Sequence, residues 1–309
     1  MTPCSKGEAD TLKEALVVRK NLKITTAFLA TGALALGLSA CGGSESDSAG
    51  GDKDGPLTVA ASPTPHAVIL DYVKKNLAKD AGLDLDVKEF TDYVLPNTAL
   101  QEGTLDANLY QHKPYLDEFN QSKGTELVAL DEIYLPPTGV YSEKVKDIAD
   151  LRKGATVAVP NDVTNEGRAL NLLAEEGLIE LKKGAGESAT PKDIAKNPKD
   201  LQFKELEAAQ VPRSLDDVDA AIVNGNYAVE ADLSPKDDSL ILEKAEGNPY
   251  ANLLVVKEGE ENDPRVKKLA KLMLHAGHSA RPRRLRRAAH DNHLPGHLPQ
   301  HRTAGACLL

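Results

Sequence analysis

The chain has 309 residues, a formal net charge of −10, no tryptophan and three cysteines. A surface of this charge repels the phosphate backbone, which excludes nucleic acid as the expected partner. The cysteines are Cys4, Cys41 and Cys307, so residues 42–306 contain no thiol for a disulfide, a cysteine nucleophile or a thiolate metal site.

The N-terminal region has the pattern of a secretory signal peptide. A basic cluster that starts at Arg19 precedes an uncharged stretch at 24–43, rich in alanine, leucine and glycine. The stretch closes on the sequence LSAC, which resembles a bacterial lipobox and ends at Cys41, whose thiol can carry a diacylglycerol. The alternative is an uncleaved transmembrane helix, but glycines and hydroxyl residues dilute a run that would need about 20 strongly apolar residues. We therefore expect a signal peptide at 1–40 and an extracytoplasmic mature protein anchored to the cell membrane.

Two segments flank this cleavage site. Residues 1–16 contain acidic side chains where a signal peptide should be basic, and we interpret them as an over-extended start. Residues 41–56 consist mainly of glycine, serine and acidic residues, which bury too little apolar surface to offset their chain entropy. We expect a flexible, lipidated tether there.

The C-terminal segment, residues 275–309, differs in composition from the body. It holds most of the chain's histidines and a run of arginines, has no lysine, and shows neither helical nor strand periodicity. Histidine pairs at 275/278 and 290/293 have a spacing seen in metal sites, but no cysteine or scaffold accompanies them, so we predict no metal site. We expect a disordered tail or the product of a frameshift.

The body, residues 57–274, alternates short β-branched runs with helical patterns. Strands are expected at 57–61, 85–90, 155–160, 201–207, 220–224 and 251–256. A helix at 67–79 places Ile69, Leu70, Val73 and Leu77 on one apolar stripe, and Gly82 follows as a stop. This alternation predicts an α/β fold with largely parallel or mixed sheets covered by helices.

Motifs that would indicate an enzyme are missing from the body sequence. Residues 57–274 contain no glycine-rich phosphate loop, no cluster of metal-ligand residues and no G-x-S-x-G nucleophile elbow. We therefore expect no catalytic residue and no cofactor, although an enzyme on the same fold and a structural lipoprotein stay open as alternatives.

Six segments of the body resemble one known family. They are ASPTPHAVIL (61–70), FTDYVLPNTAL (90–100), DANLYQHKPYL (106–116), VAVPNDVTNEGRAL (157–170), ELEAAQVPRSLDDVDAAIVNGNYA (205–228) and NPYANLLVV (248–256). Together they resemble the NlpA-type methionine-binding lipoproteins, the substrate-binding components of methionine ABC importers. The family commonly has phenylalanine where this chain has Tyr110.

This resemblance implies a two-lobe fold like that of type II periplasmic binding proteins, with the ligand in the cleft between the lobes. Lobe one would comprise 57–137 plus 229–274, and lobe two 138–228. The implied partners are methionine, the permease and ATPase subunits of the importer, and the membrane through the lipid anchor. D-methionine, a Gly-Met dipeptide and another apolar amino acid remain alternative ligands.

The resemblance also assigns ligand-binding roles. An amino acid needs a cation or amide donors for its carboxylate, an acceptor for its ammonium group and an apolar wall. Helix amides near Thr164 and the Arg168 guanidinium suit the carboxylate, and an asparagine amide suits both charged groups. The aromatic residues would form the wall, since a thioether packs well against ring edges. The implied ligand-binding residues are Tyr93, Tyr110, His112, Tyr115, Asn165, Arg168 and Asn224.

Overall fold

Two five-stranded sheets organise residues 55–279, which the computed structural model describes; for residues 275–279 it describes the backbone alone. All of them fall in the same unit of the chain, Asp47–Leu309. The expected signal peptide, Cys41 and most of the expected tether lie outside the described residues.

The first sheet has the strand order β2-β1-β3-β12-β4. Its strands are β1 (Leu57–Ala61), β2 (Leu85–Glu89), β3 (Ala107–His112), β4 (Leu127–Tyr134) and β12 (Asn252–Lys257). Strands β2, β1 and β3 run parallel, while β12 is antiparallel to both β3 and β4. The sheet is therefore mixed, and β12, which comes from far along the chain, lies between β3 and β4.

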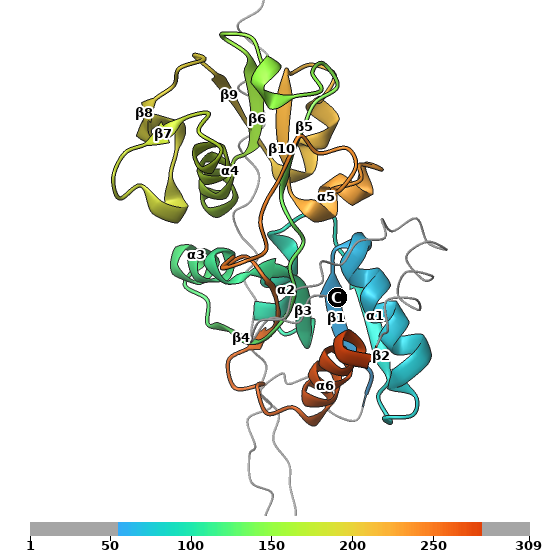
Figure 1. The fold of residues 1–309 in the computed structure, drawn as a ribbon. Helices are drawn as coiled ribbons and strands as arrows, with labels where there is room; N and C mark the ends of the chain where they lie inside the picture. The colour runs from blue at the N-terminus through green and yellow to red at the C-terminus, as the bar shows by residue number, and fades with distance from the viewer. Residues whose placement is uncertain (1–54, 280–309) are drawn as a thin grey trace, which may run out of the picture. The chain divides into compact units, whose positions relative to one another are not determined.

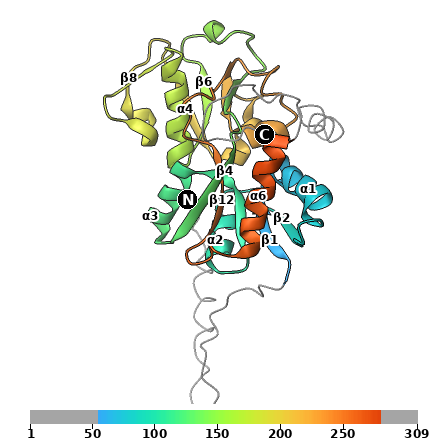
Figure 2. The ribbon, with the colours of Figure 1, turned by 60° about the horizontal axis from the view of Figure 1, so that its bottom comes forward.

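Four helices accompany this sheet: α1 (Val68–Val73), α2 (Leu95–Gln101), α3 (Lys113–Lys123) and α6 (Pro264–Ser279). Helical turns at Pro63–Ala67 and Lys74–Ala78 extend α1 at both ends. The predicted apolar stripe is the face that packs: Leu70 and Val73 are fully buried in one cluster with Met273 of α6. Helices α1 and α6 lie side by side next to β1 and β2 (Figures 1 and 2).

The second sheet has the order β11-β5-β10-β6-β9. Its strands are β5 (Gly139–Tyr141), β6 (Thr156–Pro160), β9 (Gln202–Leu206), β10 (Ala220–Val223) and β11 (Ile241–Leu242). Helices α4 (Val163–Glu175) and α5 (Gly225–Glu230) follow β6 and β10, and β7 (Glu180–Leu181) pairs with β8 (Ile194–Lys196) in a small separate sheet. Short helical turns occupy Ile148–Asp150, Gly186–Ser188, Pro191–Asp193, Ala208–Gln210 and Pro212–Ser214.

Two segments connect the sheets. Residues 135–138 lead from β4 to β5, and residues 243–251 lead from β11 back to β12. The predicted return to lobe one at residue 229 differs from this course, because Ile241 and Leu242 still pair with β5 in the second sheet. A two-residue strand has too short a pattern to be recognised from sequence, so the return was predicted too early.

The C-terminal boundary also differs from the prediction. Helix α6 continues past residue 275 to Ser279, whereas we expected an unstructured tail from residue 275. The change in composition at residue 275 therefore does not coincide with the end of the helix. The rest of the predicted tail lies outside the described residues.

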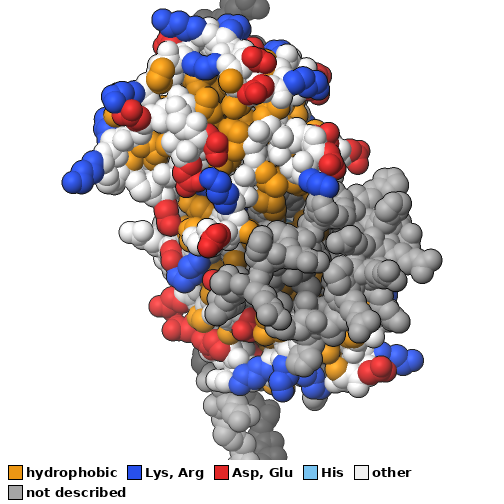
Figure 3. Space-filling view, viewed as in Figure 1, with side chains coloured by type: hydrophobic (Ala, Val, Ile, Leu, Met, Phe, Trp, Pro, Cys, Tyr) orange, Lys and Arg blue, Asp and Glu red, His pale blue; other side chains and the backbone are white. Residues whose placement is uncertain are grey.

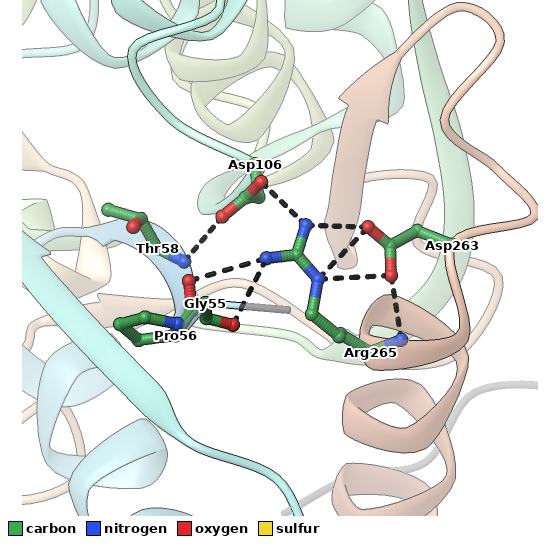
Figure 4. A network of polar contacts seen from close by, with 6 residues as sticks. All are labelled: Gly55, Pro56, Thr58, Asp106, Asp263 and Arg265. Atoms are coloured by element: carbon green, nitrogen blue, oxygen red, sulfur yellow. Dashed lines mark hydrogen bonds and ion pairs between the residues drawn. The ribbon is translucent and has the colours of Figure 1, made fainter. Parts of the chain in front are cut away.

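A polar network joins the starts of β1, β3 and α6 (Figure 4). Arg265 pairs with Asp263 at 2.7 Å and with Asp106 at 2.9 Å, and it also donates to the carbonyl oxygens of Gly55 and Pro56. Asp106 accepts in turn from the Thr58 backbone amide. The network fixes the point at which the chain enters the first sheet.

Figure 3 shows basic and acidic side chains interspersed with hydrophobic ones over one face of the described part of the chain. Within residues 55–279, no helix has the length and apolar character needed to cross a membrane.

Candidate ligand-binding site

A cavity is lined by residues of strands β3 and β12, of helices α3, α4 and α5, and of the segments between elements. All seven residues proposed from sequence line it: Tyr93, Tyr110, His112, Tyr115, Asn165, Arg168 and Asn224. Sequence reasoning missed the other residues of its lining, which are Gln111, Pro136, Gly225, Asn226 and Asn252. Four of these five, all except Pro136, lie inside the family segments quoted above.

Three tyrosines form an aromatic wall. The ring of Tyr93 lies 5.8 Å from that of Tyr110 and 5.9 Å from that of Tyr115, measured between centroids. The hydroxyls of Tyr110 and Tyr115 both donate to the Tyr93 carbonyl oxygen, at 2.7 and 3.0 Å. The hydroxyl that distinguishes Tyr110 from the family's phenylalanine is thus bonded to the backbone. The wall can present ring surface to an apolar side chain.

Direct contacts beside the cavity join the loop before α2 to helix α5. The Tyr93 hydroxyl donates to Asn226 Oδ1 at 2.5 Å, and the Tyr227 hydroxyl donates to the Thr91 carbonyl oxygen at 3.0 Å. Burial raises the pKa of Tyr93 well above its ordinary value, so this hydroxyl stays a donor. These bonds hold side chains of α5 and its neighbours against the loop before α2.

His112 links β3 to α4 in a defined tautomer. Its Nδ1 accepts from the Tyr115 backbone amide at 3.2 Å, which caps α3, and its Nε2 lies 3.2 Å from Asn165 Oδ1. Because Nδ1 accepts, the proton is on Nε2, which donates to Asn165. Burial, together with the positive charge of Arg168, lowers the pKa of His112 to about 3.

This lowered pKa predicts an acid-dependent stability. An unfolded histidine has a pKa of about 6.5, so acidification below that value protonates the unfolded state first and destabilises the fold. In His112→Gln, the slope of the free energy of unfolding against pH should be smaller than in wild type by about 1.4 kcal/mol per pH unit between about pH 6 and pH 4. Urea unfolding at a series of pH values measures both slopes. Equal slopes would show that His112 is protonated in the folded protein.

The start of α4 differs from the sequence expectation. We expected its first amides to bind a ligand anion, but Asp162 is the N-cap and accepts from the Asn165 backbone amide at 3.0 Å. Asp162 also accepts from the Asn165 side-chain nitrogen at 2.9 Å. The chain's own carboxylate therefore satisfies one amide of this helix end, which is an ordinary role for aspartate. Asp162 therefore holds both the backbone nitrogen and the side-chain nitrogen of Asn165.

Arg168 lies at the connecting segments. Its Nε donates to Glu243 Oε1 at 2.8 Å, and one Nη donates to Glu243 Oε2 and to the Pro136 carbonyl oxygen. The side chains of Arg168 and Glu243 are 3% and 9% exposed. The guanidinium carbon also lies 4.3 Å from the ring centroid of Tyr250, a cation–π contact. Glu243 was not predicted, since nothing in its local sequence marks it as a partner of Arg168.

In the side-chain amide of Asn224, the nitrogen makes a hydrogen bond and the oxygen makes none within the described residues. It follows β10 at the N-cap position of α5, and its Nδ2 donates to Asn165 Oδ1 at 2.7 Å. Its Oδ1 is buried and has no hydrogen-bond partner among the described residues. A buried acceptor without a partner costs about 1–3 kcal/mol, so this oxygen favours a ligand donor.

No metal site accompanies the cavity. Among the side chains that the structure describes, residues 55–274, no group of three or more His, Cys, Asp or Glu is placed to hold a metal ion. The side chains of the histidine pairs at 275/278 and 290/293 lie outside the described set.

Comparison with known proteins supplies a family and a fold. The family model for NlpA lipoproteins matches residues 57–280. The D-methionine-binding lipoprotein MetQ of Salmonella typhimurium is 41% identical over 245 residues, which cover 78% of this chain and 88% of that protein. Lipoprotein 28 of Escherichia coli is 43% identical, covering 80% and 90%.

Solved structures of similar proteins show the same fold. A nutrient-binding protein from Burkholderia cenocepacia bound to methionine is 47% identical, with a TM-score of 0.68, and the match covers 70% of this chain and 91% of that one. The methionine-binding protein MetQ is 41% identical with a TM-score of 0.70, covering 72% and 91%. These likenesses confirm the predicted α/β fold of the periplasmic binding protein type.

Proposed function

Because this chain belongs to the NlpA lipoprotein family, we propose that it captures methionine in the cavity between its two sheets and delivers it to an ABC importer. One observation carries the proposal: a single cavity combines a held guanidinium, an unpartnered buried acceptor and an aromatic wall. The methionine-bound relative from Burkholderia cenocepacia supports the same ligand.

The charges around the cavity suit a zwitterion. Arg168 is neutralised by Glu243, and His112 is uncharged at neutral pH. A ligand that carries one negative and one positive charge enters such a site without leaving a net charge buried, whereas a simple anion or cation would leave one. The ligand carboxylate would accept from the remaining guanidinium N–H groups, and the ammonium group would donate to Asn224 Oδ1.

The side chain of the ligand would lie against the tyrosine wall. A thioether gains favourable contacts with ring edges, and an unbranched chain can lie along the wall that Tyr93, Tyr110 and Tyr115 form. Wall shape distinguishes one methylene only weakly, so D-methionine, a Gly-Met dipeptide and other apolar amino acids are the competing ligands. We propose no chemical conversion of the ligand and hence no enzymatic activity.

The ligand carried by the purified protein tests this assignment. Mass spectrometry of the small molecules released on denaturation should identify methionine, and chiral chromatography should then assign its hand. Asn224→Leu is the matched control, since it keeps the volume but removes the free acceptor, and it should carry little or no ligand. Release of a compound without an amino-acid group from the wild type would contradict the proposal.

We also propose that Cys41 anchors the protein outside the cytoplasm by a lipid. The sequence LSAC and the tether after it motivate this, and several relatives are named lipoproteins. Cys41→Ser should move the protein from the membrane fraction to the soluble extracytoplasmic fraction, as fractionation and immunoblotting would show. Unchanged membrane retention would rule out this anchor.

A further inference from the structure

His66 lies in the family segment at 61–70, to which the sequence analysis assigned no function. It sits in the helical turn after β1 and is fully buried. Its Nε2 lies 2.7 Å from Oδ1 of Asn252, a residue that lines the cavity. The same Nε2 lies 3.2 Å from the Tyr134 hydroxyl, and the two rings meet edge to face at 5.2 Å.

The position of the proton on His66 follows from its surroundings. Nδ1 is buried and has no hydrogen-bond partner among the described residues. A buried N–H without an acceptor is strongly unfavourable, so the proton belongs on Nε2. Burial also lowers the pKa of His66 to about 4, and the ring is neutral at pH 7 with a single N–H. Nε2 therefore donates to Asn252.

The orientation of the Asn252 amide follows in turn. A neutral imidazole that donates through Nε2 can be met only by the amide oxygen, which fixes the amide against a flip. The Asn252 nitrogen, with its two donors, is then turned away from His66. A zwitterionic amino acid offers one strong acceptor, its carboxylate, so this is the group that such a donor recognises.

We propose that His66 is a positioning residue: by donating to Asn252 Oδ1 from outside the cavity, it holds the Asn252 amide nitrogen toward the ligand carboxylate. The inference rests on the proposed binding of an amino acid. It adds a residue that does not touch the ligand, and it predicts a carboxylate-selective effect when that residue is changed.

Two variants separate positioning from packing. In His66→Gln, the side-chain amide nitrogen can reach the place of Nε2 and donate to Asn252, so it should retain the selectivity. In His66→Leu, the volume is largely kept but the donor is lost, and the Asn252 amide is free to turn. Tyr134 is unchanged in both variants, and both lose its contact with the imidazole ring, so that loss cannot account for a difference between them.

Calorimetry with two ligands measures the effect. Methionine has the carboxylate, whereas methioninol replaces it with a hydroxymethyl group. The ratio of the two affinities should be large in wild type and in His66→Gln, and about tenfold or more smaller in His66→Leu, the size expected for one hydrogen bond to a charged group. An unchanged ratio in His66→Leu, with wild type binding methionine, would overturn the positioning role and leave the proposed function intact.

Nitrogen NMR on the wild-type protein gives a second test that needs no folded variant. The His66 imidazole should show a protonated Nε2 and an unprotonated Nδ1. The Asn252 side-chain amide should shift on addition of methionine and shift much less with methioninol. A proton on Nδ1, or equal shifts with both ligands, would overturn the inference; absence of any methionine binding would instead contradict the proposed function.

Discussion

Arg168→Ala is expected to lower the affinity for methionine by roughly thirty- to several-thousand-fold, because the ligand carboxylate would lose a buried guanidinium partner. The guanidinium is already held by Glu243 and the Pro136 carbonyl, so it meets the ligand in a fixed orientation. Lysine lacks the planar fork, so Arg168→Lys should restore only part of the affinity. Isothermal titration calorimetry on the three proteins measures this series.

The pairing with Glu243 adds an effect on stability that sequence alone did not indicate. Removing one partner of a buried ion pair leaves the other uncompensated and is strongly destabilising. The double variant Arg168→Ala/Glu243→Gln replaces that carboxylate by a neutral amide, so it should regain stability in urea unfolding without regaining methionine binding. Wild-type affinity in a folded Arg168→Ala protein would show that the carboxylate binds elsewhere.

Gly167→Ala is expected to destabilise the fold by about 1–3 kcal/mol or more, the range for overpacking a well-packed interior. An added Cβ at Gly167 would lie 1.9 Å from the Glu187 carbonyl oxygen and 3.1 Å from the Ala189 backbone nitrogen. Both neighbours are backbone atoms, which cannot move aside as a flexible side chain can. The glycine allows α4 to approach the turn Gly186–Ser188 closely.

The sign of the change in unfolding free energy shows whether the position of Gly167 is crowded or open. In an unobstructed helix, alanine is about 1 kcal/mol more favourable than glycine, so a protein without the close approach would gain stability. Glu175→Ala, at the exposed end of the same helix, is the matched control and should change stability by no more than about 0.5 kcal/mol. Stabilisation by Gly167→Ala in urea unfolding would contradict the packing of α4 against this turn.

Periodicity predicted six of the twelve strands in residues 55–279, because those strands have local signatures; β3, β4, β5, β7, β8 and β11 were not predicted. The buried stripe of α1 and the strands around Val157 and Ile222 were expected at or near their observed positions. The short strand β11 was not expected, since two residues show no periodicity. The Asp162 cap was missed although its signal was present, because aspartate just before a helical pattern is a common N-cap.

The site was predicted through family segments, and its supporting contacts were not. All seven proposed residues line one cavity, yet their binding roles remain predictions. Partners of cavity residues are remote in sequence: Glu243 is 75 positions from Arg168, and His66 is 186 positions from Asn252. Local pattern carries no information on such pairs, because sheet topology brings them together.

Titration of the ligand-free mature protein with methionine tests the central claim most directly. Protein freed of carried ligand by unfolding and refolding should bind one methionine per chain in a saturable reaction, and the methionine should be recovered chemically unchanged. Asn224→Leu, refolded in parallel, should bind far more weakly. Absence of saturable binding by refolded wild type, or conversion of the methionine to another compound, would contradict the account.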